Sequence, residues 1–155
     1  ANFADGGRGS DRFELLPGGE LTGASGGPGP DVFIGPQGGA FGHIDGGPGD
    51  DYLANPRGTV DSFSGGPGND YAVVSASDLF RPDRRQPAYG LDGGSNMPRW
   101  AGGGDTLEVH ANSGDPALRV VPGEGGEERL QYGTGSGWAD VPGVSGWEKI
   151  VIHSH

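Results

Sequence analysis

A six-residue pattern returns along the first part of this chain at an almost constant interval. Its copies read Gly-Gly-x-Gly-x-Asp and begin at Gly6, Gly26, Gly46 and Gly65, so successive starts lie 20, 20 and 19 residues apart. A fixed interval of this size is typical of proteins in which each repeat forms one coil and the coils stack on one another. A flexible glycine-rich linker, the alternative, would not keep its aspartates in register.

Two further features recur with the pattern. The position two residues after each aspartate is apolar and holds Phe13, Phe33, Leu53 and Ala72. A second turn lies midway between the copies, at residues 17–19, 36–38 and 56–58, and short apolar segments follow it. Each unit therefore predicts a turn, a short strand, a second turn and a second short strand. The expected fold is all-β, a parallel β-solenoid of the β-roll or β-helix type, and the crossover rule for parallel strands makes it right-handed.

The composition alone would indicate disorder, so the repeat decides whether the chain is expected to fold. The 155 residues include 35 glycines and 13 prolines and carry a formal net charge of −11, which would indicate disorder in a chain without a period. The acidic balance argues against nucleic acids and anionic membranes as partners and favours cations. No apolar run approaches the roughly 20 residues of a membrane-spanning helix, and no signal-peptide pattern is expected at Ala1. With no cysteine, disulfides and thiolate metal sites are excluded.

The pattern resembles the calcium-binding nonapeptide repeat of the RTX (hemolysin-type) family, Gly-Gly-x-Gly-x-Asp-x-U-x, where U is apolar. The resemblance covers residues 3–75 well and residues 91–109 loosely. It implies calcium ions between successive turns, held by aspartates and by carbonyl oxygens of the glycine-rich turns. The second turn of each coil lacks aspartate, so we expect calcium along one edge only.

The same resemblance implies the ligands of about three ions. The earlier turn would contribute its second, fourth and sixth positions, and the later turn its first, third and sixth, with glycine and proline binding through main-chain oxygen. The three sets are Gly7, Gly9 and Asp11 with Gly26, Pro28 and Asp31; Gly27, Gly29 and Asp31 with Gly46, Pro48 and Asp51; and Gly47, Gly49 and Asp51 with Gly65, Pro67 and Asp70. A fourth ion would follow if Asp105 completes a motif that starts at Gly93 and is interrupted by residues 96–102.

Calcium also bears on whether the chain can fold. Each coil has few apolar side chains to bury, whereas ordering the chain costs roughly 1–2 kcal/mol per residue. We expect calcium binding to supply the difference, so that the calcium-free chain is largely disordered.

The period breaks after Asp70, and two insertions follow, around residues 77–89 and at residues 96–102. They contain a group of basic and aromatic residues that could contact a protein or an acidic glycan: Arg81, Arg84, Arg85, Arg99 and Trp100. In the alternative interpretation, Trp100 covers the edge of the core and the arginines neutralise nearby aspartates.

The last third is expected to be closing β-structure. Leu107 and Val109 alternate with polar residues, residues 118–121 and 147–153 predict strands, and polar glycine-rich turns are expected between them. A stack of coils needs its last coil covered, so a β-rich cap is the expected role. We therefore divide one domain into repeat coils (1–75), an irregular coil with two insertion loops (76–104) and the cap (105–155).

Signs of catalysis are weak. His153 and His155 would share one face of the last strand and could form a transition-metal pair, or could be two histidines without a role near a frayed end. Neither a catalytic triad order nor a zinc-protease motif is present, so we do not expect an enzyme.

Function follows from the repeat. We expect a calcium-binding module, folded by calcium, in a structural or adhesive part of a secreted or cell-surface bacterial protein, because extracellular calcium suits sites of modest affinity. The alternative is an accessory domain of a secreted enzyme that binds a glycan or protein substrate through the insertion loops.

Overall fold

In the part of the chain that the structure describes, the strands form two parallel sheets and one antiparallel sheet, and the fold is all-β. The computed structural model describes residues 3–35, 39–80, 90–94, 104–123 and 127–154. Within these ranges the only helix is α1 (Ala76–Leu79), and no helix there has the length and hydrophobicity that crossing a membrane requires. The expectation of an all-β protein with parallel sheets is confirmed.

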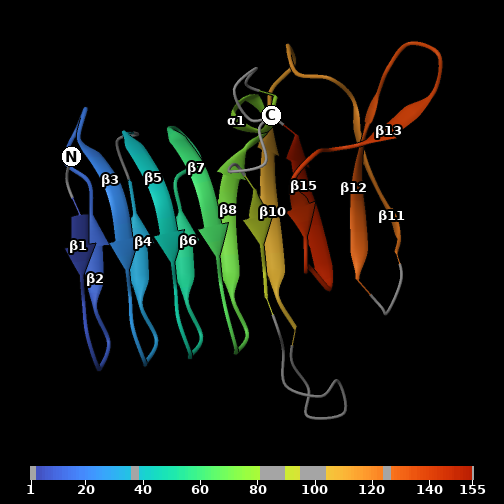
Figure 1. Ribbon diagram of the computed structural model, residues 1–155. Helices are drawn as coiled ribbons and strands as arrows, with labels where there is room; N and C mark the ends of the chain where they lie inside the picture. Colours follow the sequence, from blue (N-terminus) through green and yellow to red (C-terminus); the bar gives the residue numbers. More distant parts are fainter. Residues whose placement is uncertain (1–2, 36–38, 81–89, 95–103, 124–126, 155) are drawn as a thin grey trace.

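Strands alternate between the two parallel sheets as the chain advances through the repeats (Figure 1). The first sheet contains, in spatial order, β1 (Phe3–Asp5), β3 (Glu20–Ser25), β5 (Ala40–Asp45), β7 (Thr59–Ser64), β9 (Leu91–Asp92) and β14 (Val144–Ser145). The second sheet contains β2 (Arg12–Glu14), β4 (Val32–Ile34), β6 (Tyr52–Ala54), β8 (Tyr71–Ser75), β10 (Thr106–Ala111) and β15 (Lys149–Ser154). Within residues 3–75, neighbouring strands therefore come from successive repeats.

The register of the second sheet follows the sequence repeat. Phe13 pairs with Phe33, Phe33 with Leu53, and Leu53 with Ala72, so the predicted apolar positions lie in one row. Leu107 and Ile150 continue this row. Parallel pairing of strands one repeat apart puts every motif aspartate beside its counterpart in the next repeat.

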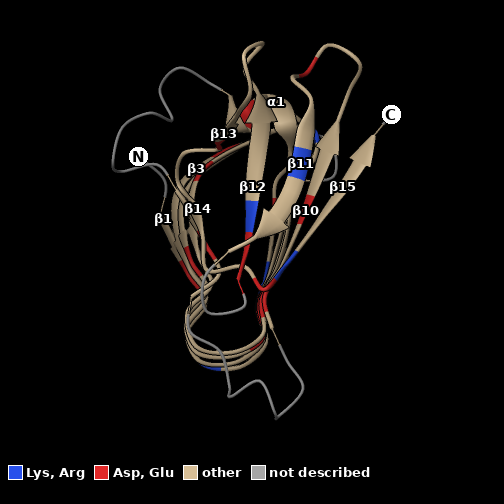
Figure 2. Cartoon of the chain, turned by 90° about the vertical axis from the view of Figure 1, so that its right-hand side faces the viewer, with Lys and Arg blue, Asp and Glu red and all other residues tan. Residues whose placement is uncertain are grey.

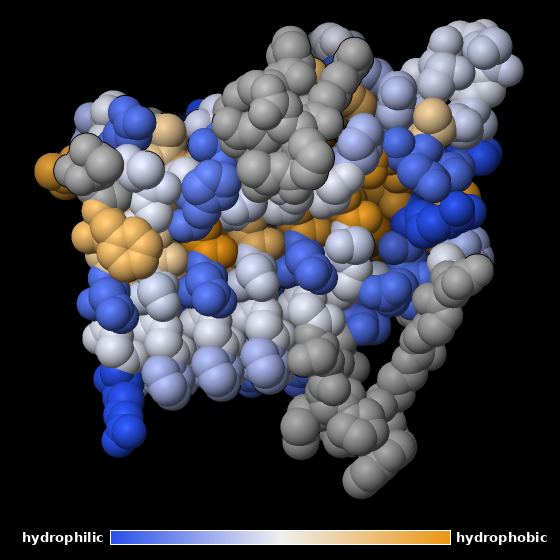
Figure 3. Space-filling model, viewed as in Figure 1, coloured by the Kyte–Doolittle hydropathy of each residue, from blue (hydrophilic) through white to orange (hydrophobic). Residues whose placement is uncertain are grey.

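Apolar side chains from both parallel sheets form one core. The ring of Phe33 in β4 meets the ring of Phe41 in β5 edge to face, with 6.5 Å between centroids. Both rings are buried, as are Phe63 and Leu53. In the space-filling view an apolar band crosses the strands, and neutral rows of turn residues lie below it (Figure 3).

A third sheet stands at the C-terminal end of the stack. It contains β11 (Leu118–Pro122), β12 (Glu128–Gly133) and β13 (Trp138–Asp140) in antiparallel order. The sequence predicts strands at residues 118–121 and 147–153, and β11 and β15 lie there. The expectation of polar glycine-rich turns between them is wrong at β12 and β13. Leu130 and Val141 are buried and join the core, and β12 contacts β14 and β15.

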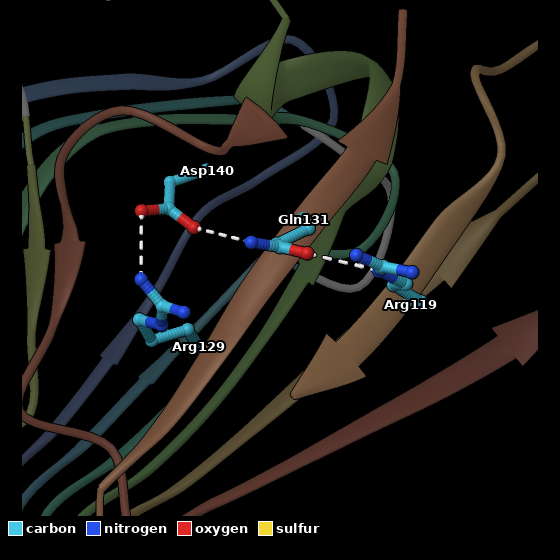
Figure 4. A network of polar contacts seen from close by, with 4 residues as sticks. All are labelled: Arg119, Arg129, Gln131 and Asp140. Atoms are coloured by element: carbon cyan, nitrogen blue, oxygen red, sulfur yellow. Dashed lines mark hydrogen bonds and ion pairs between the residues drawn. The ribbon is translucent and has the colours of Figure 1, made fainter. Parts of the chain in front are cut away.

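Polar side chains on the outer face of this third sheet explain why β12 and β13 look like turns in the sequence. Gln131 lies at the centre, accepting a hydrogen bond from Arg119 Nε and donating one to Asp140 Oδ1, each at 2.9 Å (Figure 4). Asp140 also forms an ion pair with Arg129 at 3.3 Å. One face of the sheet is therefore polar and the other packs on the core, which is the alternation of a half-buried strand.

Candidate metal centre

The motif aspartates form a ladder of hydrogen bonds along one edge of the molecule. Oδ1 of Asp31 accepts the backbone N–H of Asp11 at 2.9 Å, and Oδ1 of Asp51 accepts that of Asp31 at 2.9 Å. Asp70 and Asp105 repeat the arrangement toward the N–H groups of Asp51 and Asp70, at 2.8 and 2.6 Å. Each of these carboxylates thus uses one oxygen to hydrogen-bond the backbone of the coil before it.

The other carboxylate oxygen points toward the motif's first glycine. The Oδ2 atoms of Asp11, Asp31, Asp51 and Asp70 are buried and have no hydrogen-bond partner within the part of the chain that the structure describes. A Cβ atom added at Gly26 would collide with Asp31 Oδ2 and lie 2.7 Å from the carbonyl oxygen of Gly46. The carboxylate oxygen and the carbonyl oxygen of the next repeat therefore border the same small space.

This arrangement repeats from one coil to the next. At Gly46 the added Cβ atom would meet Asp51 Oδ2 and the carbonyl oxygen of Gly65, and at Gly65 it would meet Asp70 Oδ2 and the carbonyl oxygen of Gly93. Two oxygens that face one space, with no donor between them, need a proton or a cation.

Burial changes the acidity of these aspartates. Loss of hydration raises the pKa of Asp31, that of Asp51 to about 7 and that of Asp70 to about 8, each from an ordinary value of 3.8. The backbone N–H of the preceding aspartate lowers each pKa, and neighbouring carboxylates raise it again. In the absence of a cation, burial and mutual repulsion therefore favour the neutral acids.

The turns bring backbone oxygens close together. Gly47 and Gly49 have φ values of 87° and 128°, and a Cβ atom at Gly49 would collide with the carbonyl oxygen of Gly29 in the coil before. Only glycine combines this backbone conformation with so close an approach. The motif's second and fourth residues, which are expected to be ligands, therefore each stack directly on the corresponding residue of the coil before.

The third-position carbonyls have a partner already. Pro28, Pro48 and Pro67 accept the N–H groups of Gly9, Gly29 and Gly49 at 2.9, 2.8 and 2.9 Å. A carbonyl oxygen has two lone pairs, so each could accept this bond and still bind a cation. Figure 2 shows that acidic residues gather where the strands meet these lower turns.

Asp105 takes the aspartate position expected of it. It is fully buried, accepts the N–H of Asp70 and follows Asp70 in the ladder although 35 residues separate the two. Gly93 and Gly94 lie in the corresponding turn, while residues 95–103 lie outside the described residues. The same is true of every expected partner-contact residue, namely Arg81, Arg84, Arg85, Arg99 and Trp100.

Sequence reasoning missed one further step of the ladder. Glu148 Oε2 accepts the backbone N–H of Asp105 at 2.9 Å, as the motif aspartates do for one another. A Cβ atom at Gly93 would collide with the carbonyl oxygen of Gly146, which therefore takes the place of a motif's first glycine. The usable signal is the end of β14, where Ser145-Gly146 repeats the Ser25-Gly26 of β3.

Along the aspartate ladder, side chains alone do not make a metal centre. Among the described residues no three His, Asp or Glu side chains surround a metal position. Each space along the ladder combines carboxylates with backbone carbonyls, so any cation bound there would depend on main-chain oxygen as much as on side chains.

Comparisons with known proteins give no guide to the cation. No protein-family model, curated protein or solved structure matches the chain.

Proposed function

We propose that this chain is a calcium-binding repeat module whose folding depends on the ion, within a structural or adhesive part of a secreted or cell-surface protein. The observation that carries the proposal is the row of buried Oδ2 atoms, of which those of Asp31, Asp51 and Asp70 each face a carbonyl oxygen of the next coil. The proposed architecture is the parallel β-solenoid of RTX proteins, and the proposed module has no catalytic role.

Calcium fits the chemistry of these spaces. It is a hard cation that takes six to eight oxygen ligands, readily combining carboxylates with backbone carbonyls. Nitrogen and sulfur ligands are missing from all three expected ligand sets, which disfavours zinc and copper. The first three ions would lie between consecutive motif turns, and a fourth would lie between Asp70 and Asp105.

Calcium would also remove the main electrostatic obstacle to folding. Asp31, Asp51, Asp70 and Asp105 are at most 2% exposed and follow one another along the ladder. Burying a column of like charges is strongly unfavourable unless a counter-charge is buried with it. A divalent ion between each pair supplies that charge, so metal binding and folding become one equilibrium.

The first experiment follows folding by far-UV circular dichroism in a chelator and then during calcium titration. We expect a largely disordered chain without calcium and a β-sheet spectrum with it, because the free energy of calcium binding stabilises the folded state. A folded spectrum in chelator that calcium leaves unchanged would contradict the proposal.

A matched pair of variants tests the ladder itself. Asp51→Asn keeps an oxygen for the N–H of Asp31 but removes a charge shared by two ion positions. It should raise the calcium concentration needed for half-folding by at least about 10-fold. Asp50→Asn changes the exposed neighbour and should shift it by less than about 2-fold. Isothermal titration calorimetry should also count fewer ions for Asp51→Asn, and equal behaviour of the two variants would contradict the assignment.

A further inference from the structure

Two strands of the second sheet bring histidines and a glutamate together away from the aspartate ladder. In β10, Glu108 and His110 are two residues apart and lie on the face opposite to the buried Leu107 and Val109. In β15, His153 pairs directly with His110. The sequence also predicts His155 as a companion of His153, but His155 lies outside the described residues. Within them, the sheet brings His110 and Glu108 to His153.

The side chains converge on one carboxylate. Nε2 of His153 contacts Oε1 of Glu108, and Nε2 of His110 lies 3.9 Å from the same oxygen. The two imidazole rings are stacked with centroids 5.0 Å apart and planes 21° apart, and each ring directs its Nε2 atom toward Glu108. The other oxygen, Oε2, accepts a hydrogen bond from the hydroxyl of Tyr71 at 3.2 Å, which holds the carboxylate in place.

We propose that Glu108, His110 and His153 form a binding site for a divalent transition metal of the zinc class. Two imidazole nitrogens and one carboxylate oxygen are the donors that such ions prefer, and three protein ligands leave a position for water. Two residues alternating on one strand, with a third on the adjacent strand, supply donors from one face of a sheet.

Only one of the two nitrogen–oxygen separations is near the value that a metal ion needs. With bonds of about 2.0–2.1 Å in a tetrahedral site, two ligand atoms lie about 3.4 Å apart. Nε2 of His110 is near this separation from Glu108, whereas His153 touches the carboxylate, so the three groups do not enclose a metal position as they lie. For a metal ion to bind, the His153 imidazole would have to turn away from Oε1 of Glu108, so that the ion takes the place of their direct contact.

Solvent can reach this site. The side chains of His110, His153 and Glu108 are 27%, 45% and 18% exposed, so an ion can enter without unfolding. The site uses none of the ladder aspartates, and calcium binds imidazole poorly because it prefers oxygen. The two kinds of metal should therefore bind independently.

The test measures zinc binding by calorimetry to the chain folded in excess calcium. Cobalt(II), added in place of zinc, reports its coordination through its visible absorption. We expect one zinc ion per chain in excess calcium, and imidazole-coordinated cobalt. His153→Ala and His110→Ala should each weaken zinc binding by more than the about 10- to 100-fold that loss of an outer-shell partner costs.

His43→Ala is the matched control. His43 also lies on an exposed sheet face, where its Nδ1 is 2.6 Å from Ser62 Oγ, and its loss should leave zinc affinity unchanged. Glu108→Gln, which keeps the shape of the side chain but removes its charge, should weaken zinc binding. Circular dichroism checks that every variant is folded. Absence of zinc binding to the folded chain, or equal affinity in His153→Ala and His43→Ala, would overturn the proposal. Neither result would affect the calcium proposal, whose readout is folding.

Discussion

Each motif residue has a separate physical task. The aspartate joins two repeats with Oδ1 and turns Oδ2 toward the oxygens of the next one, while the first glycine leaves the room that Oδ2 occupies. The second and fourth glycines adopt positive φ and allow the turns to stack. Because every position is constrained by its neighbour in the next coil, substitutions here should act across coils.

Gly49→Ala should show this cost. The new methyl group meets the carbonyl oxygen of Gly29, and φ of 128° is unfavourable for any residue with a Cβ atom. We expect a loss of about 1–3 kcal/mol in the free energy of unfolding, measured by denaturant titration in saturating calcium. Gly114→Ala is the control, since nothing lies within 4 Å of its added Cβ atom, and it should change stability by less than about 1 kcal/mol. Equal effects would show that coil stacking does not constrain Gly49.

At the scale of strands, local pattern predicts the repeats but not how the stack ends. Coils one period apart are visible in the sequence because the motif returns at a fixed interval. Glu148 follows Asp105 in the ladder across 43 residues, and the sequence marks that pairing only by the Ser145-Gly146 dipeptide, without the rest of the motif. The sequence does not indicate strand β12 for a related reason. Arg129 and Gln131 lie on its outer face and make the segment look polar, although Leu130 between them is buried.

Trp147 is the side chain that ties this last coil to the core. It is fully buried, stacks on Phe63 with 6.3 Å between centroids, and donates its Nε1–H to the carbonyl of Leu91 at 3.1 Å. Trp147→Phe loses the hydrogen bond and leaves a cavity, so we expect the free energy of unfolding to fall by about 2 kcal/mol or more. Trp138→Phe is the control, because Trp138 is 42% exposed and contacts Arg119 at the surface, and it should cost less than about 1 kcal/mol. Denaturant titration in calcium compares the two variants, and equal losses would mean that Trp147 does not anchor the coil.

For the whole molecule, the period predicts the all-β class and the parallel pairing, whereas the acidity of the ladder can be known only from the assembled sheets. Asp50 and Asp51 are adjacent in sequence, yet Asp51 is 2% exposed and Asp50 is exposed at the surface. Their difference arises because the second sheet buries alternate side chains and the neighbouring coils exclude water. Burial raises the pKa of Asp51, and no local sequence feature indicates how completely Asp51 is buried.

The raised pKa values predict opposite pH dependence with and without calcium. In the unfolded chain each ladder aspartate has a pKa near 3.8, whereas in the folded, metal-free chain it is about 7 for Asp51 and about 8 for Asp70. The folded state binds more protons between these values, so the stabilising contribution is complete below pH 3.8 and is lost as the pH rises through 7 to 8. In chelator, circular dichroism should therefore show more β-structure at pH 4 to 5 than at pH 8.

Calcium reverses the trend because it competes with protons for the same carboxylates. Calorimetry should show affinity that rises from pH 5 to pH 8, with protons released on binding and therefore an apparent enthalpy that depends on the buffer's ionisation heat. The Asp51→Asn variant should release fewer protons than Asp50→Asn, which keeps the buried carboxyl. Calcium affinity independent of pH, with no proton release, would mean that the ion binds outside the ladder.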